Sequence, residues 1–237
     1  MIVVIIPTYN EASNISKVIK NVFCLNLKDL NILVVDDSSP DGTSKIVKKI
    51  IKKNKNLHLL INEEKKGLGK AYMVGMDYAI NQLNAKVLVE MDADLSHDTK
   101  ILPNMINYTK THDLILGSRY IKGGSIPKDW AFHRKFVSYV GNLVFRFFFS
   151  WKINDWTTGY RVIKSKVYNK LKLELNEDMF LGYTFQVGFL YKAIKKGFKI
   201  KEYPLIFIDR KKGSSKFMGW NYIKNNLFFI LKTKFKK

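Results

Sequence analysis

Short apolar runs alternate with helical patterns along the first half of the chain. The runs are rich in β-branched residues, as buried strands are, and they cover residues 2–8, 31–35, 57–61, 86–91 and 114–118. Between them, apolar residues recur three and four positions apart, as Ile15, Val18 and Ile19 do, which predicts helices over 15–23, 43–51, 71–83 and 101–108. Strands separated by short helices predict an α/β fold with a mostly parallel central sheet and helices on both faces.

The second half of the chain is less regular. A loop rich in glycine and proline comes first, and a polar turn follows further on. The predicted elements here are an aromatic helix over 132–151, a turn over 155–161, a helix over 183–196, a strand pair over 199–209 and a last helix over 220–234. Because there is no internal repeat and no low-complexity linker, the sequence predicts a single domain over residues 1–237 with a C-terminal helical elaboration.

The composition is that of a globular protein without a disulfide framework. Of the 237 residues, 46% are hydrophobic and 26% are charged, and the one cysteine, Cys24, favours a reducing compartment. The run 2–6 has neither a basic leader nor a small-residue cleavage site, so we expect a core strand rather than a signal peptide. The stretch nearest to a membrane span, 143–151, is interrupted by Arg146, so no transmembrane helix is predicted.

The net charge narrows the class of partner. A formal charge of +21 indicates an anionic partner, which can be nucleic acid, a phospholipid surface or a phosphorylated substrate; the alternative is a solvated surface rich in lysine. No acidic residue follows Asp209, and the basic segment 211–237 holds eight lysines, four of them in residues 232–237. The aromatic residues of this segment are Phe217, Trp220, Tyr222, Phe228, Phe229 and Phe235. Basic segments with aromatic anchors favour an anionic membrane interface, although the aromatic residues here, and those of the helix 132–151, can instead pack on the core.

The tripeptide Asp92-Ala93-Asp94 directly follows the predicted strand 86–91. Two carboxylates two positions apart at the mouth of a strand are costly unless a cation lies between them. Mg²⁺ or Mn²⁺ fits, because these ions take a few hard oxygen ligands and keep other positions for substrate phosphates. The alternative is that both aspartates make only local hydrogen bonds in a turn. His97, close by, is interpreted as a polar cap rather than a metal ligand.

Polar motifs also follow the other predicted strands. They are residues 7–11 after the first strand, 36–43 after the second and 117–120 after the fifth. Ligands of a doubly wound sheet bind beyond the carboxyl ends of its strands, so we expect these motifs and Asp92 to share one site. Asp37 can accept hydrogen bonds from a nucleotide base or ribose, unless its segment is a simple turn. Tyr9 and Glu11 can line the same cleft.

Arginine is rare in this sequence, where 36 of the 41 basic residues are lysine. A guanidinium group grips phosphate or carboxylate with two parallel hydrogen bonds, so arginines near strand ends mark candidate phosphate contacts. Arg119 follows the fifth strand, Arg161 ends the turn 155–161, and Arg210 precedes a run of lysine, glycine and serine. We interpret these three and Arg134 as candidate phosphate ligands, and Arg146 as a side chain that extends to solvent from its aromatic helix.

With these motifs assembled, the sequence resembles the dolichyl-phosphate (polyprenyl-phosphate) mannose synthases, within the inverting glycosyltransferase family two. The resemblance covers nearly the whole chain. The opening motif 7–11 and Asp92-Ala93-Asp94 occur in many sugar transferases, whereas three further motifs are more specific to the mannose synthases. These are Ser39-Pro40-Asp41-Gly42-Thr43, Gly67-Leu68-Gly69-Lys70-Ala71-Tyr72, and Asp209-Arg210 followed by Gly213, Ser215 and Lys216. One departure is Gly188, which stands where the resemblance leads us to expect an acidic residue.

The resemblance implies a GT-A type nucleotide-sugar fold, with a nucleotide-sugar half over 1–120 and an acceptor and membrane-proximal half over 121–237. It also implies roles for single residues. Guanosine would be held by Pro7, Tyr9, Glu11, Val35 and Asp37, and the sugar diphosphate by Asp92, Ala93, Asp94, Arg119, Arg210 and Lys216. Mg²⁺ or Mn²⁺ would be held by Asp92 and Asp94, with Ser96 as an additional candidate. The catalytic residues would be Asp94, Arg119, Arg134 and Asp155, where both arginines grip the acceptor phosphate and Asp155 orients the acceptor or an arginine.

The reaction implied by the resemblance moves mannose from GDP-mannose to dolichyl (polyprenyl) phosphate with inversion, giving dolichyl phosphate mannose for protein glycosylation. The open alternatives are a polyprenyl-phosphate glucosyltransferase that uses UDP-glucose and a noncatalytic basic module that binds an anionic membrane. The paired carboxylates would repel RNA, so no nucleic acid is expected as a partner. We expect a peripheral protein on the cytoplasmic face of a membrane. A small membrane-anchoring subunit is a candidate partner, because some members append transmembrane helices that are not seen here.

Overall fold

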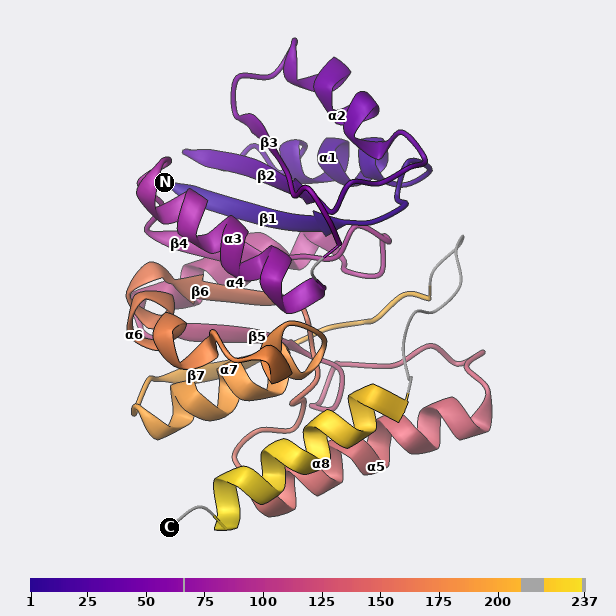
Figure 1. Cartoon of the computed structure of the whole chain (residues 1–237), viewed down its shortest axis with the longest axis vertical. Helices are drawn as coiled ribbons and strands as arrows, with labels where there is room; N and C mark the ends of the chain where they lie inside the picture. The colour runs from indigo at the N-terminus through magenta and orange to yellow at the C-terminus, as the bar shows by residue number, and fades with distance from the viewer. Residues whose placement is uncertain (66, 210–219, 236–237) are drawn as a thin grey trace.

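A seven-stranded mixed sheet forms the centre of the computed structural model, which describes residues 1–65, 67–209 and 220–235 (Figure 1). The strands, in the order β3-β2-β1-β4-β6-β5-β7, are β1 (Ile2–Thr8), β2 (Leu30–Asp36), β3 (Leu57–Ile61), β4 (Val87–Glu90), β5 (Leu114–Ser118), β6 (Arg161–Lys164) and β7 (Ile200–Pro204). β1 and β2 are apolar on both faces, which is typical of strands buried between two layers of helices.

The sheet is parallel except for β6. β2 pairs in parallel with β1 and β3, β1 with β4, and β5 with β7, whereas β6 runs antiparallel to both β4 and β5. β6 therefore joins two parallel groups of strands into one sheet, and its register places Arg161 opposite Glu90 of β4. The loops that follow β1, β2, β4 and β5 consequently lie at one edge of the sheet, where the polar motifs of the sequence are found.

Helices cover both faces of the sheet. They are α1 (Ile15–Phe23), α2 (Thr43–Ile51), α3 (Leu68–Asn81), α4 (Leu102–Asn107), α5 (Phe132–Phe148), α6 (Ser165–Leu175), α7 (Thr184–Lys195) and α8 (Trp220–Phe235), with short 3₁₀ turns η1 (Thr99–Ile101), η2 (Tyr108–Lys110) and η3 (Asp178–Phe180). One hydrophobic core lies under α3, α6 and α7 and includes Tyr72 and Phe185. The other lies under α1, α2 and α4 and includes Ile15 and Val47. The predicted fold class is confirmed.

α5 and α8 lie together at one end of the molecule (Figure 1). The buried Phe229 of α8 has its ring centroid 5.5 Å from that of Phe149, directly after α5. On α5, Asn142 and Phe145 are the buried residues. Among the described side chains of this pair, the exposed large apolar residues are Phe132, Phe136, Val137, Tyr139, Leu143 and Phe147 of α5 and Leu227, Phe228 and Leu231 of α8. Apart from Val137, those of α5 recur every three or four positions and form one face, which we name the α5 outer face.

The structure differs from the sequence prediction in the second half of the chain. β6 and α6 occupy residues 161–175, where the sequence analysis predicts only the end of a turn. The predicted strand pair over 199–209 is wrong, because β7 is a single strand and Ile206 makes only an isolated bridge to Ser125. α3 begins at Leu68, earlier than predicted, since its first turn packs closely against residues 180–182.

Candidate active site

The loops after β1, β2 and β4 enclose a pocket of about 280 Å³, which we name the carboxylate pocket. Seven residues singled out in the sequence line it, namely Pro7, Tyr9, Glu11, Asp37, Asp92, Ala93 and Asp94. Val35 does not line it, because this residue of β2 is fully buried and packs against Gly75 of α3. Its side chain therefore does not reach a ligand in the pocket, and the role implied for Val35 by the resemblance is left to its backbone.

Hydrogen bonds hold the rim of the carboxylate pocket. Asn62 donates to Asp37 at 2.6 Å, and Asn14 donates to Glu11 at 2.9 Å. Burial raises the pKa of the Asp37 carboxyl; the hydrogen bond from Asn62 opposes this shift and the charge of Asp36 adds to it. The ammonium group of Lys65 lies 4.0 Å from the centre of the Tyr9 ring, so that a cation covers one face of this aromatic wall.

Hydrogen bonds from neighbouring residues fix the orientation of Asp92 and Asp94. The Ser96 amide and hydroxyl donate to Oδ1 of Asp94 at 3.0 and 2.6 Å. Tyr72 donates to Oδ1 of Asp92 at 3.3 Å, and the Asp92 amide donates to Nδ1 of His97 at 3.1 Å. Ser96 is fully buried with its hydroxyl directed to Asp94, so here it supports that carboxylate instead of presenting an oxygen to the pocket.

His97 supports the loop that carries the two carboxylates. Its ring stacks on that of Tyr160, with centroids 4.7 Å apart and planes within 5° of parallel. Since Nδ1 accepts the Asp92 amide proton, the neutral ring carries its own proton on Nε2, which lies 3.7 Å from Oδ2 of Asp92. This arrangement agrees with the interpretation of His97 as a polar cap.

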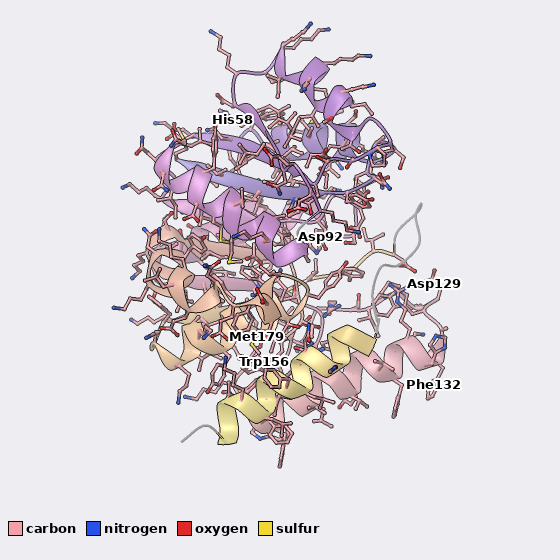
Figure 2. All side chains as sticks on the ribbon, viewed as in Figure 1. His58, Asp92, Asp129, Phe132, Trp156 and Met179 are labelled. Atoms are coloured by element: carbon pink, nitrogen blue, oxygen red, sulfur yellow. The ribbon has the colours of Figure 1, made fainter. Side chains whose placement is uncertain are left out.

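The donor groups suit a divalent cation that is shared with a substrate. Asp92 and Asp94 present hard carboxylate oxygens to one pocket (Asp92 is labelled in Figure 2). Within residues 1–65, 67–209 and 220–235, no group of three or more histidine, cysteine, aspartate or glutamate side chains is arranged to hold a metal. Asp92 and Asp94 are thus the candidate ligands of Mg²⁺ or Mn²⁺, and phosphate oxygens and water would complete the coordination.

A second, smaller pocket of about 110 Å³ lies beside the first, and we name it the arginine pocket. Arg119 and Arg134 both line it, together with Trp130, Ser138 and Thr157. The guanidinium of Arg134 lies 3.8 Å from the Trp130 ring centre and 3.3 Å from Asp209. Guanidinium groups can donate paired hydrogen bonds to a phosphate, so these two arginines remain the candidate ligands for an acceptor phosphate.

The Asp155 carboxylate orients the Arg119 side chain from outside the arginine pocket. The fully buried Asp155 carboxylate accepts hydrogen bonds from Nε and Nη2 of Arg119, both at 2.7 Å, and from the Arg119 amide at 3.0 Å. Nη2 also donates to Thr157 at 2.8 Å. Of the two roles left open for Asp155, the geometry supports the orientation of an arginine, because its carboxylate does not line the arginine pocket.

Arg161 has no access to a phosphate. It is fully buried on β6, with Nε 3.8 Å from the equally buried Glu90. Burial raises the pKa of Glu90 to about 7, while the charge of Arg161 and the amide of Gln186 oppose that shift. The interpretation of Arg161 as a phosphate ligand is therefore wrong. Arg210 and Lys216 lie outside the described residues.

Three residues line both pockets: Leu68, Asp92 and Tyr183. Leu68 and Tyr183 are missing from the site predicted from the sequence, although the run Gly67-Leu68-Gly69 is a sequence signal of a close backbone approach. A Cβ at Gly69 would lie 2.0 Å from the Phe180 carbonyl oxygen, so the small residue brings the start of α3 against the segment before α7. The two pockets thus meet at Asp92, the residue that would also contact the metal.

Gly188 lies away from both pockets. A Cβ at this position would lie 2.2 Å from the Phe180 ring, because α7 packs here into the core. An acidic side chain at this position would have to displace that aromatic ring. The departure at Gly188 is therefore a packing feature of this chain.

The sequence model of "Glycosyl transferase family 2" matches residues 3–172. The chain belongs to glycosyltransferase family 2. It is 37% identical to a polyprenol monophosphomannose synthase from Mycolicibacterium smegmatis, over 92% of this chain and 81% of that protein. It is 34% identical to an undecaprenyl-phosphate mannosyltransferase from Micrococcus luteus, over 92% of this chain and 88% of that protein.

Two solved structures share the fold. A mannosyltransferase from Pyrobaculum calidifontis, in complex with GDP-Man and Mn²⁺, superposes with a TM-score of 0.61 at 21% identity over 90% of this chain. This chain spans 58% of the length of that protein. Glucosyl-3-phosphoglycerate synthase from Mycobacterium tuberculosis, in complex with UDP, superposes with a TM-score of 0.69 at 15% identity, over 98% of this chain and 79% of that one. Both are fold-level similarities.

Proposed function

We propose that this family 2 glycosyltransferase moves mannose from GDP-mannose to dolichyl (polyprenyl) phosphate with inversion, giving dolichyl phosphate mannose. The observation that carries the proposal is the meeting of the carboxylate pocket and the arginine pocket at Asp92. The first has the groups to hold a metal–diphosphate, and the second those to hold an acceptor phosphate. The names of the two curated relatives support polyprenyl phosphate as acceptor and mannose as the transferred sugar.

The donor would lie in the carboxylate pocket. Asp37 would accept hydrogen bonds from guanine, while Tyr9 and Pro7 would flank the nucleoside. Asp92 and Asp94 would hold Mg²⁺ or Mn²⁺, which would neutralise the diphosphate and stabilise it as leaving group. The sugar would then lie at the junction of the two pockets, against Leu68 and Tyr183.

The acceptor needs positioning more than activation. A polyprenyl phosphate is already anionic at neutral pH, so its oxygen attacks without a strong general base. Arg119 and Arg134 would offset the repulsion between this phosphate and the donor diphosphate and would direct one oxygen to the anomeric carbon. Displacement of GDP from the opposite face through an oxocarbenium-like transition state would invert that carbon.

Two experiments test this proposal. Calorimetric titration with GDP and UDP, each with and without Mn²⁺, tests the donor nucleotide. Transfer from GDP-mannose and from UDP-glucose to a short-chain polyprenyl phosphate tests the reaction. We expect GDP to bind at least about tenfold more tightly than UDP, because only guanine offers adjacent N–H donors to the Asp37 carboxylate. Mn²⁺ should strengthen the binding of GDP. Tighter binding of UDP with transfer of glucose would establish the glucosyltransferase alternative, and the absence of transfer from both donors would leave a noncatalytic basic module.

The α5 outer face is proposed to rest on an anionic membrane. Its aromatic and aliphatic side chains point away from the core, next to exposed apolar residues of α8. Arg134 and Ser138 lie on the opposite side of the same helix and line the arginine pocket, so membrane contact would place that pocket about one helix diameter from the bilayer surface. In residues 1–65, 67–209 and 220–235, no helix is long and apolar enough to cross a bilayer. Within the predicted basic segment, Lys232 pairs with Glu177, and residues 211–219, 236 and 237 lie outside the described residues.

Membrane contact predicts a selective effect of charge on the α5 outer face. The double variant Phe136→Glu/Phe147→Glu should lower co-sedimentation with phosphatidylglycerol-containing vesicles by about tenfold or more, because two aromatic anchors would become anionic. The matched control is Leu173→Glu on α6, since this side chain is 86% exposed on another surface. Binding that is equally reduced by the control, or unchanged by the double variant, would contradict this membrane face.

A further inference from the structure

The turn at residues 154–157 is held by a carboxylate on the neighbouring edge strand. Glu202 of β7 accepts hydrogen bonds from the Asn154 amide at 3.1 and 3.0 Å, from its side-chain amide at 2.8 Å and from the Asp155 amide at 3.0 Å. Three N–H donors of one turn thus converge on a single charged group. Hydrogen bonds to an ionised acceptor are about twice as strong as those between neutral groups, so Glu202 fixes this turn more firmly than a neutral side chain would.

α5 holds the same turn from the other side. Oδ1 of Asn142 accepts the Trp156 amide at 2.7 Å, and Nδ2 of Asn142 lies 3.4 Å from Oγ1 of Thr157. Asn142 is 3% exposed on an otherwise apolar stretch of helix, where a buried amide is tolerated only because its hydrogen bonds are made. The turn therefore has little freedom to shift relative to β7 or to α5.

We infer that Glu202 is a positioning residue for the acceptor phosphate, acting through the turn on Arg119. Glu202 does not line either pocket, so it acts on substrate only through other groups. The path is short: Glu202 fixes the Asp155 backbone, and the Asp155 carboxylate fixes Nε and Nη2 of Arg119. This inference rests on the proposed function, in which Arg119 binds that phosphate.

The sheet brings the three parts together. β7 pairs in parallel with β5, with Glu202 opposite Leu116, and β5 ends at Ser118, directly before Arg119. Glu202, Asp155 and Arg119 thus come from β7, the turn before β6 and the end of β5. A displacement of about 1 Å in such a support can cost about 100-fold in rate, because attack requires near alignment of the reacting atoms.

A double-mutant cycle between Glu202 and Arg119 tests the inference. Glu202→Ala should raise the KM for a short-chain polyprenyl phosphate by about tenfold or more and should change GDP affinity by less than about twofold. Glu202→Gln keeps one acceptor oxygen, so its increase in KM should be smaller. In an Arg119→Ala background, Glu202→Ala should change kcat/KM by less than about twofold, since the group through which it acts is gone. Glu174→Ala, which removes a partly exposed ion-paired glutamate on α6, is the matched control.

The outcomes separate this inference from the proposed function. If Arg119→Ala impairs transfer while Glu202→Ala does not, or if the two losses add, the positioning role of Glu202 is overturned and the proposed function stands. An equal loss of GDP affinity in Glu202→Ala would also overturn it, as a general structural effect. If Arg119→Ala leaves the acceptor KM unchanged, the acceptor site itself is misassigned. If thermal denaturation shows that Arg119→Ala does not fold, Arg119→Lys serves as the background. In that background, Glu202→Ala should lower kcat/KM by less than it does in the wild type.

Discussion

Asp94→Asn should reduce mannosyl transfer by about a thousandfold, because the metal that stabilises the leaving diphosphate would lose one of its two protein carboxylates. The asparagine retains an oxygen for the amide and hydroxyl of Ser96, so the loop should keep its shape while the charge is removed. Initial rates of transfer from labelled GDP-mannose, at saturating polyprenyl phosphate and a range of Mn²⁺ concentrations, measure the loss. EDTA should abolish wild-type transfer, and added Mn²⁺ should restore it.

The matched control for Asp94 is Asp29, which lies at the N-terminal end of β2, opposite the end of the sheet that carries Asp94. Asp29 is exposed just before β2 and has a positive φ of 57°, which asparagine tolerates, so Asp29→Asn makes the same chemical change far from the pockets. Its rate should remain close to that of the wild type. A rate for Asp94→Asn that matches the control, together with insensitivity to EDTA, would rule out the proposed metal site.

Arg119→Lys should separate acceptor binding from donor binding. The lysine keeps the positive charge but loses the planar fork that Asp155 and Thr157 orient, so kcat/KM for polyprenyl phosphate should fall by about 100-fold. GDP affinity should change by less than about twofold, because Arg119 lines the arginine pocket and not the carboxylate pocket. Steady-state kinetics with varied acceptor and calorimetry with GDP provide the two measurements.

The control for Arg119 is another arginine with an aromatic contact. Arg146 lies over the Trp151 ring at 5.0 Å and lines neither pocket, so Arg146→Lys should leave both kinetic constants near wild type. A parallel loss of GDP affinity and acceptor turnover in Arg119→Lys would instead place this arginine at the donor.

The first half of the fold was predictable because its signals are local. β1 to β5 are continuous apolar runs, and the helices between them have regular apolar spacing, so each element can be read within a short window. β6 has only four residues and follows a polar turn, and its identity as a strand depends on pairing with β4 and β5. α6 does have a local signal, because its buried residues Val167, Tyr168 and Leu171 recur at helical spacing.

The site was predictable to the extent that its residues follow strands. Asp37, Asp92 and Asp94 line one pocket because parallel strands end at the same edge. The role of Arg161 was misjudged because its partner, Glu90, is identified only by the register of β6. Supporting residues such as Glu202 and Asn142 carry no local signal, since each contacts a turn that is distant in sequence.

The position of β6 has a consequence for the order of assembly. β4 supplies the loop with the two carboxylates, yet its second edge is completed by a strand that the ribosome makes much later, after α5. Until then, β4 has an unpaired edge, and β5 has no partner that connects it to β1. The chain between β4 and β6 loses conformational entropy when this long loop closes, before the strand pairing can stabilise it. We therefore expect β4 and β5 to lack stable pairing with each other through β6 until β6 leaves the ribosome. The end of the sheet that carries Asp92 and Asp94 would then be among the last parts to form.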